Sequence, residues 1–201
     1  MNTNIKKCNN IKQDDELRFE EAIRNIILWI GDDPNREGLI DTPKRMIKSF
    51  KEYFSGYRED PCQILKKTFT ETSGYQNIVL LKNIEFSSHC EHHMAPISGI
   101  AHIAYYPNKR VVGISKIARI VEIFSKRLQI QERLTNDIAK SIQESLEPMG
   151  VAVQINAKHS CMSNRGVNQR STQVSTYTLL GCFKCEEHKS KIFFDLVNEN
   201  K

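Results

Sequence analysis

Three histidines and a cysteine fall within one short run in the middle of the chain, His89-Cys90-Glu91-His92-His93. Cys90 and His93 stand three residues apart, so their thiolate and imidazole can bind one metal ion, as in the C-x-x-H half-site of a zinc protein. His92 cannot easily reach the same ion as both of its neighbours, which leaves its imidazole free for proton transfer. The run predicts a zinc site that needs at least one further ligand from elsewhere in the chain.

Two completions of this site imply different classes of function. In the first, Cys161 is the third protein ligand and water takes the fourth position, which is the open arrangement of a catalytic zinc. In the second, Cys182 and Cys185 close a structural four-ligand site, as in a zinc-stabilised module that binds nucleic acid or protein. The two half-sites would then lie about 90 residues apart, whereas zinc ribbons and fingers space them by about 12 to 20 residues. We therefore favour Cys161 and interpret Cys182 and Cys185 as incidental.

The residues near Cys161 favour hydrolytic chemistry. His159 lies two residues before Cys161, at the end of an alternating strand pattern, and would lie close to a zinc-bound water. With two imidazoles, His92 and His159, one can protonate a leaving nitrogen while the other takes a proton. Glu132 offers a carboxylate for a guanidine-like or amide edge. The cations that could hold a phosphorylated substrate are Arg45, Lys116, Arg119 and Arg165.

The elements that must position these residues alternate in pairs. Hydrophobic periodicity predicts helices over about 14–30, 42–55, 115–128, 131–147 and 186–198, and strands over about 77–85, 100–106, 151–158 and 172–183. Thr42 and Ser115 are expected N-caps, residues 1–13 an irregular tail, and the cysteine and histidine run a loop between the first two strands. Paired strands alternating with paired helices predict an antiparallel α+β fold.

Composition narrows the classes of function. The 39% hydrophobic and 26% charged residues are typical of a soluble globular protein, and no apolar run approaches the roughly 20 residues of a membrane span. The first residues lack the apolar core of a signal peptide, so we expect a cytoplasmic protein with no membrane partner. The net charge of +5 comes from scattered bases, so no nucleic-acid partner is expected. The six cysteines lack a secretory context and are expected as free thiols or metal ligands.

Five short motifs, in this order, resemble those of the zinc-dependent GTP cyclohydrolase I family. They are Asn35-Arg36-Glu37-Gly38-Leu39 with Thr42-Pro43-Lys44-Arg45, Cys90-Glu91-His92-His93, Gly113-Ile114-Ser115-Lys116-Ile117-Ala118-Arg119, Gln131-Glu132-Arg133-Leu134-Thr135, and His159-Ser160-Cys161-Met162 with Arg165-Gly166. The Cys182 and Cys185 pair is not part of the family's site, and His89 is an additional imidazole. Each motif is short, but five in family order make the resemblance specific.

The resemblance implies a tunnelling fold, which is an antiparallel four-stranded sheet backed by two helices, here with an N-terminal helical extension. Residues 1–68 would form the tail and this extension, and residues 69–201 the catalytic domain. It further implies a homo-oligomer, a decamer of two stacked pentamers, with each active site between subunits.

The resemblance also implies the reaction and its residues. One Zn²⁺ per subunit would be held by Cys90, His93 and Cys161. GTP would lose formate as its imidazole ring opens, and would rearrange to 7,8-dihydroneopterin triphosphate, the first step of tetrahydrofolate and pterin biosynthesis. The catalytic residues would be His92, His159 and Ser115; Gln131 and Glu132 would read the guanine edge; Lys116, Arg119, Arg165, Arg45 and Lys48 would hold the triphosphate. The alternative enzyme is another tunnelling-fold member that acts on a pterin or deazapurine.

Overall fold

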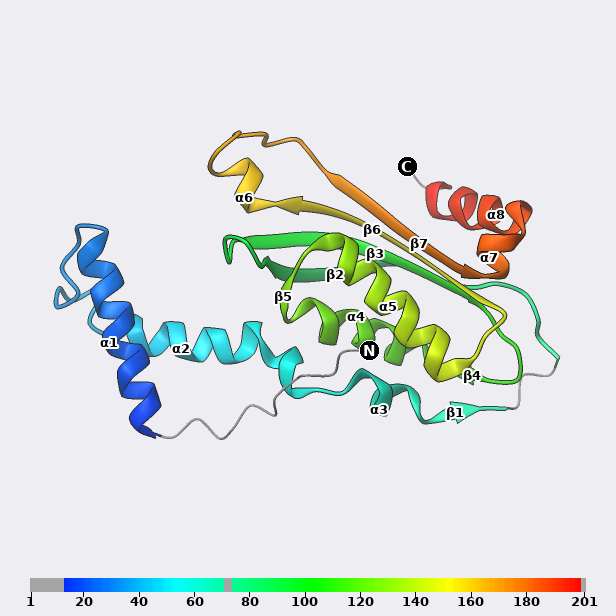
Figure 1. The fold of residues 1–201 in the computed structure, drawn as a ribbon, viewed down its shortest axis with the longest axis horizontal. Coiled ribbons are helices and arrows are strands. Elements are labelled where there is room, and N and C mark those ends of the chain that lie inside the picture. Colours follow the sequence, from blue (N-terminus) through cyan, green and yellow to red (C-terminus); the bar gives the residue numbers. More distant parts are fainter. Residues whose placement is uncertain (1–12, 71–73, 200–201) are drawn as a thin grey trace.

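The computed structural model describes residues 13–70 and 74–199. The expected tail over residues 1–13 and Cys8 therefore lie outside the described residues, apart from the start of the first helix. No helix in the described ranges is both long enough and apolar enough to cross a membrane. The predicted α+β architecture is confirmed: helices and an antiparallel sheet form separate layers (Figure 1).

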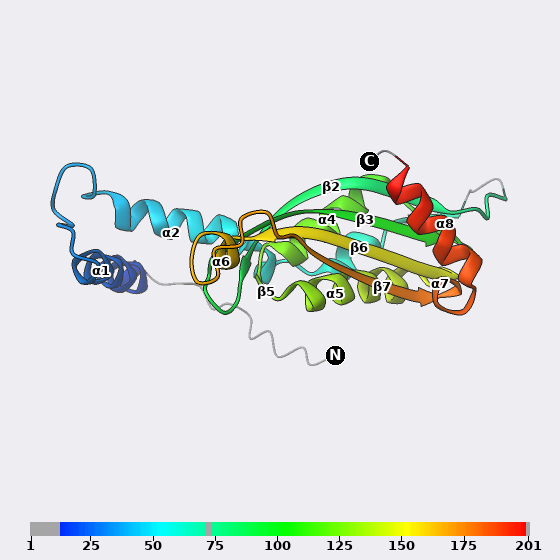
Figure 2. The same cartoon turned by 90° about the horizontal axis from the view of Figure 1, so that it is seen from above.

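An N-terminal helical extension projects from the body of the protein (Figures 1 and 2). It consists of α1 (Gln13–Trp29) and α2 (Thr42–Tyr53), joined by a loop in which Gly31 takes a φ of +95°. The N-cap of α2 is Asp41, so Thr42 is the first helical residue and the expected Thr42 cap is wrong. Lys51 of α2 forms an ion pair with Glu16 of α1. This ion pair joins the two helices, and several of their large apolar side chains are exposed to solvent.

A short helical turn, η1 (Ser55–Arg58), joins the extension to the body. Gly56 is buried there: its N–H donates to the carbonyl of Lys126 at 3.1 Å, and its own carbonyl accepts from Arg127 Nε at 3.0 Å. A Cβ at Gly56 would lie 2.0 Å from the carbonyl oxygen of Ile123. The absence of a side chain is what allows the two backbones to approach.

Replacing Gly56 with alanine is expected to lower the free energy of unfolding by about 3 kcal/mol, the upper end of the range for overpacking a close contact. The midpoint of denaturant unfolding measures this change. Gly113→Ala is the control, because a Cβ there meets no described atom within 4 Å. This variant should lower the free energy of unfolding by less than about 1 kcal/mol. Equal shifts for the two variants would contradict the close contact at Gly56.

Four long strands form the antiparallel part of the sheet. They are β2 (Val79–Cys90), β3 (Pro96–Tyr106), β6 (Gly150–His159) and β7 (Val174–Gly181), in the order β2-β3-β6-β7. Strand β2 runs through the cysteine and histidine run as far as Cys90, so only the residues after Cys90 form the expected loop. Asn83, at a φ of +58°, lies in a bulge where the pairing of β2 with β3 shifts register.

The expected four-stranded sheet needs a correction, because it has a fifth strand, β5 (Leu128–Gln129), parallel to the end of β2. The chain leaves one helix and begins the next at this point, and it runs close enough to β2 for the backbone N–H of Glu91 to donate to the carbonyl of Gln129 at 3.0 Å. A separate two-stranded sheet pairs β1 (Thr68–Phe69) with β4 (Val111–Val112). Such short pairings follow from tertiary contact and have no period of their own in the sequence.

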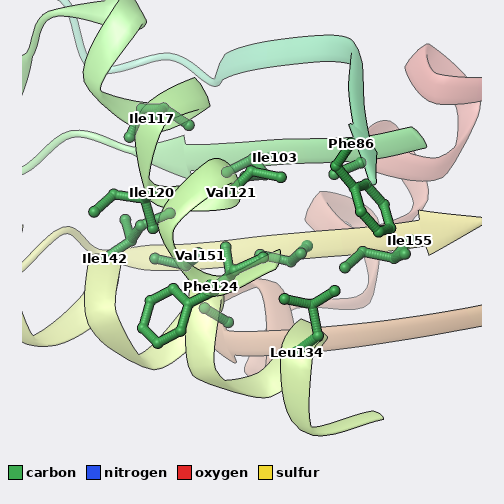
Figure 3. Close-up of a cluster of buried hydrophobic side chains, with 14 of the residues drawn as sticks. Phe86, Ile103, Ile117, Ile120, Val121, Phe124, Leu134, Ile142, Val151 and Ile155 are labelled. Carbon is green, nitrogen blue, oxygen red and sulfur yellow. The ribbon is translucent and has the colours of Figure 1, made fainter. Parts of the chain in front are cut away.

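The main core lies between one face of the sheet and two helices, α4 (Ile114–Ser125) and α5 (Gln131–Leu146). Val151, Val153 and Ile155 of β6 belong to this core, as their alternation predicted. Figure 3 shows Val151 and Ile155 beside the apolar stripe of the helices. The buried stripe of α4 comprises Ile117, Ile120, Val121 and Phe124, and that of α5 Leu134, Ile138 and Ile142. Leu65, at the end of α3 (Pro61–Leu65), also reaches this core.

A smaller core covers part of the opposite face of the sheet. Helices α7 (Cys182–Cys185) and α8 (Glu187–Asn198) fold back after β7 (Figures 1 and 2). Phe183 packs there against both Tyr106 and Phe193, with ring centroids at 5.1 Å and 6.0 Å. This helical return buries one end of that face of the sheet.

Candidate metal centre

Cys90, His93 and Cys161 come together at one end of the sheet. Cys90 is the last residue of β2, His93 lies in the following turn, and Cys161 lies in α6 (Ser160–Ser163) directly after β6. Their sulfur and nitrogen ligand atoms all lie within 4.8 Å of one another. The turn is tight, since the N–H of Met94 donates to the carbonyl of Cys90 at 2.8 Å and Met94 takes a φ of +50°.

These three side chains suit a zinc ion. Two thiols and one imidazole are the donor set of a known class of catalytic zinc site, which keeps its fourth position open. Cys182 and Cys185 lie elsewhere, at the two ends of α7: Cys182 is half-buried against the smaller core and Cys185 is exposed. The four-ligand alternative therefore finds no support in the positions of these two thiols.

The surroundings of Cys161 affect its ionisation. Burial raises the pKa of the Cys161 thiol, and the neighbouring Cys90 raises it further, while Arg165 acts in the opposite direction. The raised pKa means that Cys161 favours its protonated thiol form when no cation is bound at the centre. A metal that binds here must displace that proton, so metal binding is coupled to proton release.

Arg165 lies at the rim of the metal centre. From the loop that follows α6, its Nη1 donates to His93 Nε2 at 2.8 Å. The guanidinium cannot lose its proton, so Nε2 must be the acceptor in this bond. Arg165 is therefore the one candidate phosphate-binding residue with a described contact to a metal-centre residue.

Two residues without an assigned role in the sequence analysis, Glu91 and Arg133, form an ion pair beside the centre. The other carboxylate oxygen of Glu91 lies 3.9 Å from His92 Nε2, and His92 Nδ1 lies 4.0 Å from the sulfur of Cys90. Arg133 also donates to the carbonyl of Leu128 at 3.1 Å. The signal in the sequence was an acid placed between a thiol ligand and a histidine, with an arginine in the later Gln131–Thr135 motif.

His159 is the last residue of β6, two residues before Cys161. Its Nε2 lies 2.8 Å from Gln131 Oε1, at the start of α5. Burial lowers the pKa of His159, and the carboxylate of Glu132 acts in the opposite direction. Glu132 is exposed in the first turn of α5. One chain thus brings His159, Gln131 and Glu132 close together, with Gln131 buried and Glu132 open to solvent.

Ser115 and Arg119 lie in a different place. Both line a hollow of about 400 Å³ between α4 and β2, together with Glu85, Ser87 and other residues. Residues 84–87 of β2 line this hollow, and they precede Cys90 by three to six residues. The hollow therefore lies roughly 10–20 Å along the strand from the metal centre. The N-cap of α4 is Gly113 and makes no side-chain cap bond, so the expected Ser115 cap is wrong.

Lys116 is held at the end of α3. Its Nζ donates to the carbonyl of Ile64 at 2.7 Å and to that of Lys67 at 3.0 Å. A cation beside carbonyl groups at a helix C-terminus is a favourable arrangement. In this chain, Lys116 therefore ties α3 to α4.

Arg45 and Lys48 lie on the extension and are exposed. Arg45 Nη2 donates to the carbonyl of Gly38 at 3.3 Å, and Lys48 lines a hollow of about 280 Å³ formed by side chains of α1 and α2. Neither has a described contact with the residues of the metal centre. One chain therefore leaves the five expected phosphate-binding residues in four separate places.

The extra imidazole, His89, contacts the extension. Its ring centroid lies 4.8 Å from that of Tyr53 and 5.2 Å from that of Phe54, at the end of α2. Burial lowers the pKa of His89. His89 thus links the extension to the strand that carries Cys90.

Comparison with known proteins gives one consistent result. The family model described as GTP cyclohydrolase I matches residues 19–198. The chain is 56% identical over 173 residues to "GTP cyclohydrolase 1" of Pelagibacter ubique, covering 86% of each chain. It is 53% identical over 178 residues to the protein of that name from Maricaulis maris, covering 89% of this chain and 87% of the relative. For the protein of that name from Hyphomonas neptunium, the identity is 50% over 195 residues, covering 97% and 95%.

Proposed function

The chain belongs to the GTP cyclohydrolase I family, and on this premise we propose that it converts GTP to 7,8-dihydroneopterin triphosphate. The guanine imidazole ring is opened by hydrolysis, formate leaves, and the ribose rearranges, as the first step of tetrahydrofolate and pterin biosynthesis. The observation that carries this proposal is the Cys90, His93 and Cys161 cluster, within a chain that matches the family over residues 19–198.

Cys90, His93 and Cys161 would hold one Zn²⁺ per subunit. Zinc bound there would supply a Lewis acid that lowers the pKa of a water in its open position to about 7. The spacing of the three ligand atoms supports this role, since all lie within 4.8 Å of one another.

The residues around the centre have separate roles in the proposal. His92 and His159 move protons to and from the opening ring, and the exposed side chain of His92 is free to meet substrate. Glu132 accepts hydrogen bonds from the N–H groups of the guanine edge, for which its exposed carboxylate at the start of α5 is suited. Ser115 assists the later steps at the ribose.

The triphosphate needs several fixed cations, because charge-assisted hydrogen bonds to phosphate are the strong ones. Arg165 is at the metal centre, Arg119 lines the hollow beside β2, and Arg45 and Lys48 lie on the extension. Lys116 would have to leave the carbonyls of Ile64 and Lys67 to reach a phosphate. A site that uses all of them requires more than one subunit.

Several features support assembly into a homo-oligomer with the tunnelling fold. Among the described residues, β7 pairs on one side only, with β6, and β2 is paired on its outer side only at His89 and Cys90. Unpaired strand edges of this kind readily pair with another chain. The extension also exposes large apolar side chains, with Trp29 85% exposed and Leu17, Ile26 and Leu28 each more than half exposed. The family resemblance extends this to a decamer of two stacked pentamers.

The decisive test is turnover of GTP by the purified, zinc-loaded protein, with formate and the fluorescent oxidised pterin measured together. Both products should appear with GTP, and neither with ATP, which lacks the guanine edge. The absence of both products from zinc-loaded protein would overturn the proposal. Turnover of a purine or pterin without a triphosphate, unaffected by exchange of Arg165 or Lys116, would identify another tunnelling-fold enzyme.

A further inference from the structure

Gln131 is almost completely buried, with 2% of its surface exposed, at the first residue of α5. Its amide nitrogen donates to two backbone carbonyl oxygens, those of Ile155 at 3.1 Å and Val174 at 2.9 Å. Carbonyl oxygens accept and never donate, so turning the amide around would set its own oxygen against them. The backbone of β6 and β7 therefore fixes which end of this amide carries nitrogen.

Two hydroxyl groups are consistent with the same orientation. Thr135 donates to the backbone carbonyl of Gln131 at 2.8 Å and lies 2.6 Å from the hydroxyl of Thr176. Because the hydrogen of Thr135 is already used, Thr176 donates to Thr135. The oxygen of Thr176 then has no hydrogen to offer and lies 3.2 Å from the Gln131 amide nitrogen, where it can only share one of the two amide hydrogens that the carbonyls accept. An acceptor at this position is compatible with nitrogen, and not with oxygen, at this end of the amide.

The remaining atom of the amide, Gln131 Oε1, lies 2.8 Å from His159 Nε2. An amide oxygen only accepts, so the hydrogen in this bond must belong to the histidine. A neutral imidazole with its hydrogen on Nε2 has Nδ1 as its bare nitrogen. The network thus sets both the tautomer and the orientation of the ring.

We infer that Gln131 is a positioning residue that holds His159 in its Nε2–H form, with Nδ1 as the ring nitrogen available to the substrate. This assignment rests on the proposed function, which gives His159 its work on the guanine ring. It replaces the role expected from the sequence, in which the Gln131 side chain reads the guanine edge. A side chain with 2% of its surface exposed and both ends bonded within the protein has no group left for a substrate.

The kinetic test compares Gln131→Met with Gln143→Met. Methionine has nearly the shape of glutamine but makes no comparable hydrogen bond. Gln131→Met should lower kcat by about 10- to 100-fold, as expected when the partner that orients an active-site imidazole is lost, with KM for GTP unchanged within about twofold. The side chain of Gln143, near the far end of α5, bonds only the carbonyl of Pro148 among its described contacts, and Gln143→Met should leave kcat unchanged. A raised KM with unchanged kcat for Gln131→Met would overturn the inference.

The second readout is the nitrogen spectrum of the imidazoles, from magic-angle-spinning NMR of zinc-loaded protein labelled at histidine. His159→Asn identifies the signals of His159 by their disappearance. The inference expects the wild type to show a protonated Nε2 and a bare Nδ1, and Gln131→Met to lose that single form. A His159 protonated on Nδ1 in the wild type overturns the inference, even where Gln131→Met does not fold. The spectrum needs no turnover, so its outcome is independent of whether GTP is the substrate.

Discussion

Replacing Cys161 with alanine is expected to remove zinc from the purified protein and to lower formate release from GTP by more than about 100-fold, the upper figure for losing a residue that only supports a metal ligand. The physical reason is that Cys161 provides one of three ligand atoms gathered within 4.8 Å. Two ligands, Cys90 and His93, would remain, and such a pair binds zinc weakly. Metal content by elemental analysis and formate release measure the two effects on the same sample.

Cys185→Ala is the matched control for this experiment. Cys185 is an exposed thiol at the end of α7, outside the metal cluster. Its removal should leave both the zinc content and formate release at the level of the unchanged protein. Zinc lost on changing Cys185 and retained on changing Cys161 would mean that the ion is structural, and the open catalytic centre would be wrong.

The parts of this fold that the sequence could predict are the strands and helices in which hydrophobic residues recur at a regular spacing. The alternation of Val151, Val153 and Ile155 indicated which face of β6 lies in the main core, and the helical spacing in α4 and α5 indicated the faces that cover it. The metal cluster was also predictable, since Cys90 and His93 lie three residues apart at the end of one strand. Cys161 could be selected as the third ligand because the alternating pattern of the preceding strand places it at the end of that strand.

The remaining features depend on contacts between distant segments. Strand β5 exists because the link between α4 and α5 passes beside Cys90, which no local pattern records. Lys116 looked like a free cation, yet its amine bonds carbonyls about 50 residues earlier in the chain. Gln131 lies in a motif that resembles a substrate-reading one, and only the positions of β6 and β7 reveal that its amide is used internally.

Arg119→Ala is expected to lower kcat/KM for GTP by about 10- to 100-fold, the equivalent of losing one hydrogen bond to a charged group. Zinc content should stay unchanged, because Arg119 lines the hollow beside β2 and is not part of the metal cluster. Formate release at GTP concentrations below KM measures this loss. Arg110→Ala is the control, since Arg110 is an exposed base with no described role in either place, and it should leave kcat/KM unchanged.

Mixing two such variants tests whether one active site takes residues from two subunits. Cys161→Ala and Arg119→Ala chains, coexpressed with different tags and purified through both, form mixed assemblies. If the metal centre of one subunit works with the Arg119 hollow of its neighbour, about one quarter of the sites in a random mixture join two intact halves, because each half is intact with a probability of one half. Activity should then recover to about a quarter of the wild-type level.

The control for this recovery pairs Cys161→Ala with Cys90→Ala, which damage the same half of the site. No arrangement of those two chains gives an intact metal centre, so mixed assemblies should stay inactive. If Arg119 instead served the metal centre of its own chain, mixing it with Cys161→Ala would also give no intact site and no recovery. Recovery in the first mixture alone therefore distinguishes a shared site from a self-contained one. It would also explain why one chain leaves Arg165, Arg119 and Arg45 in three separate places.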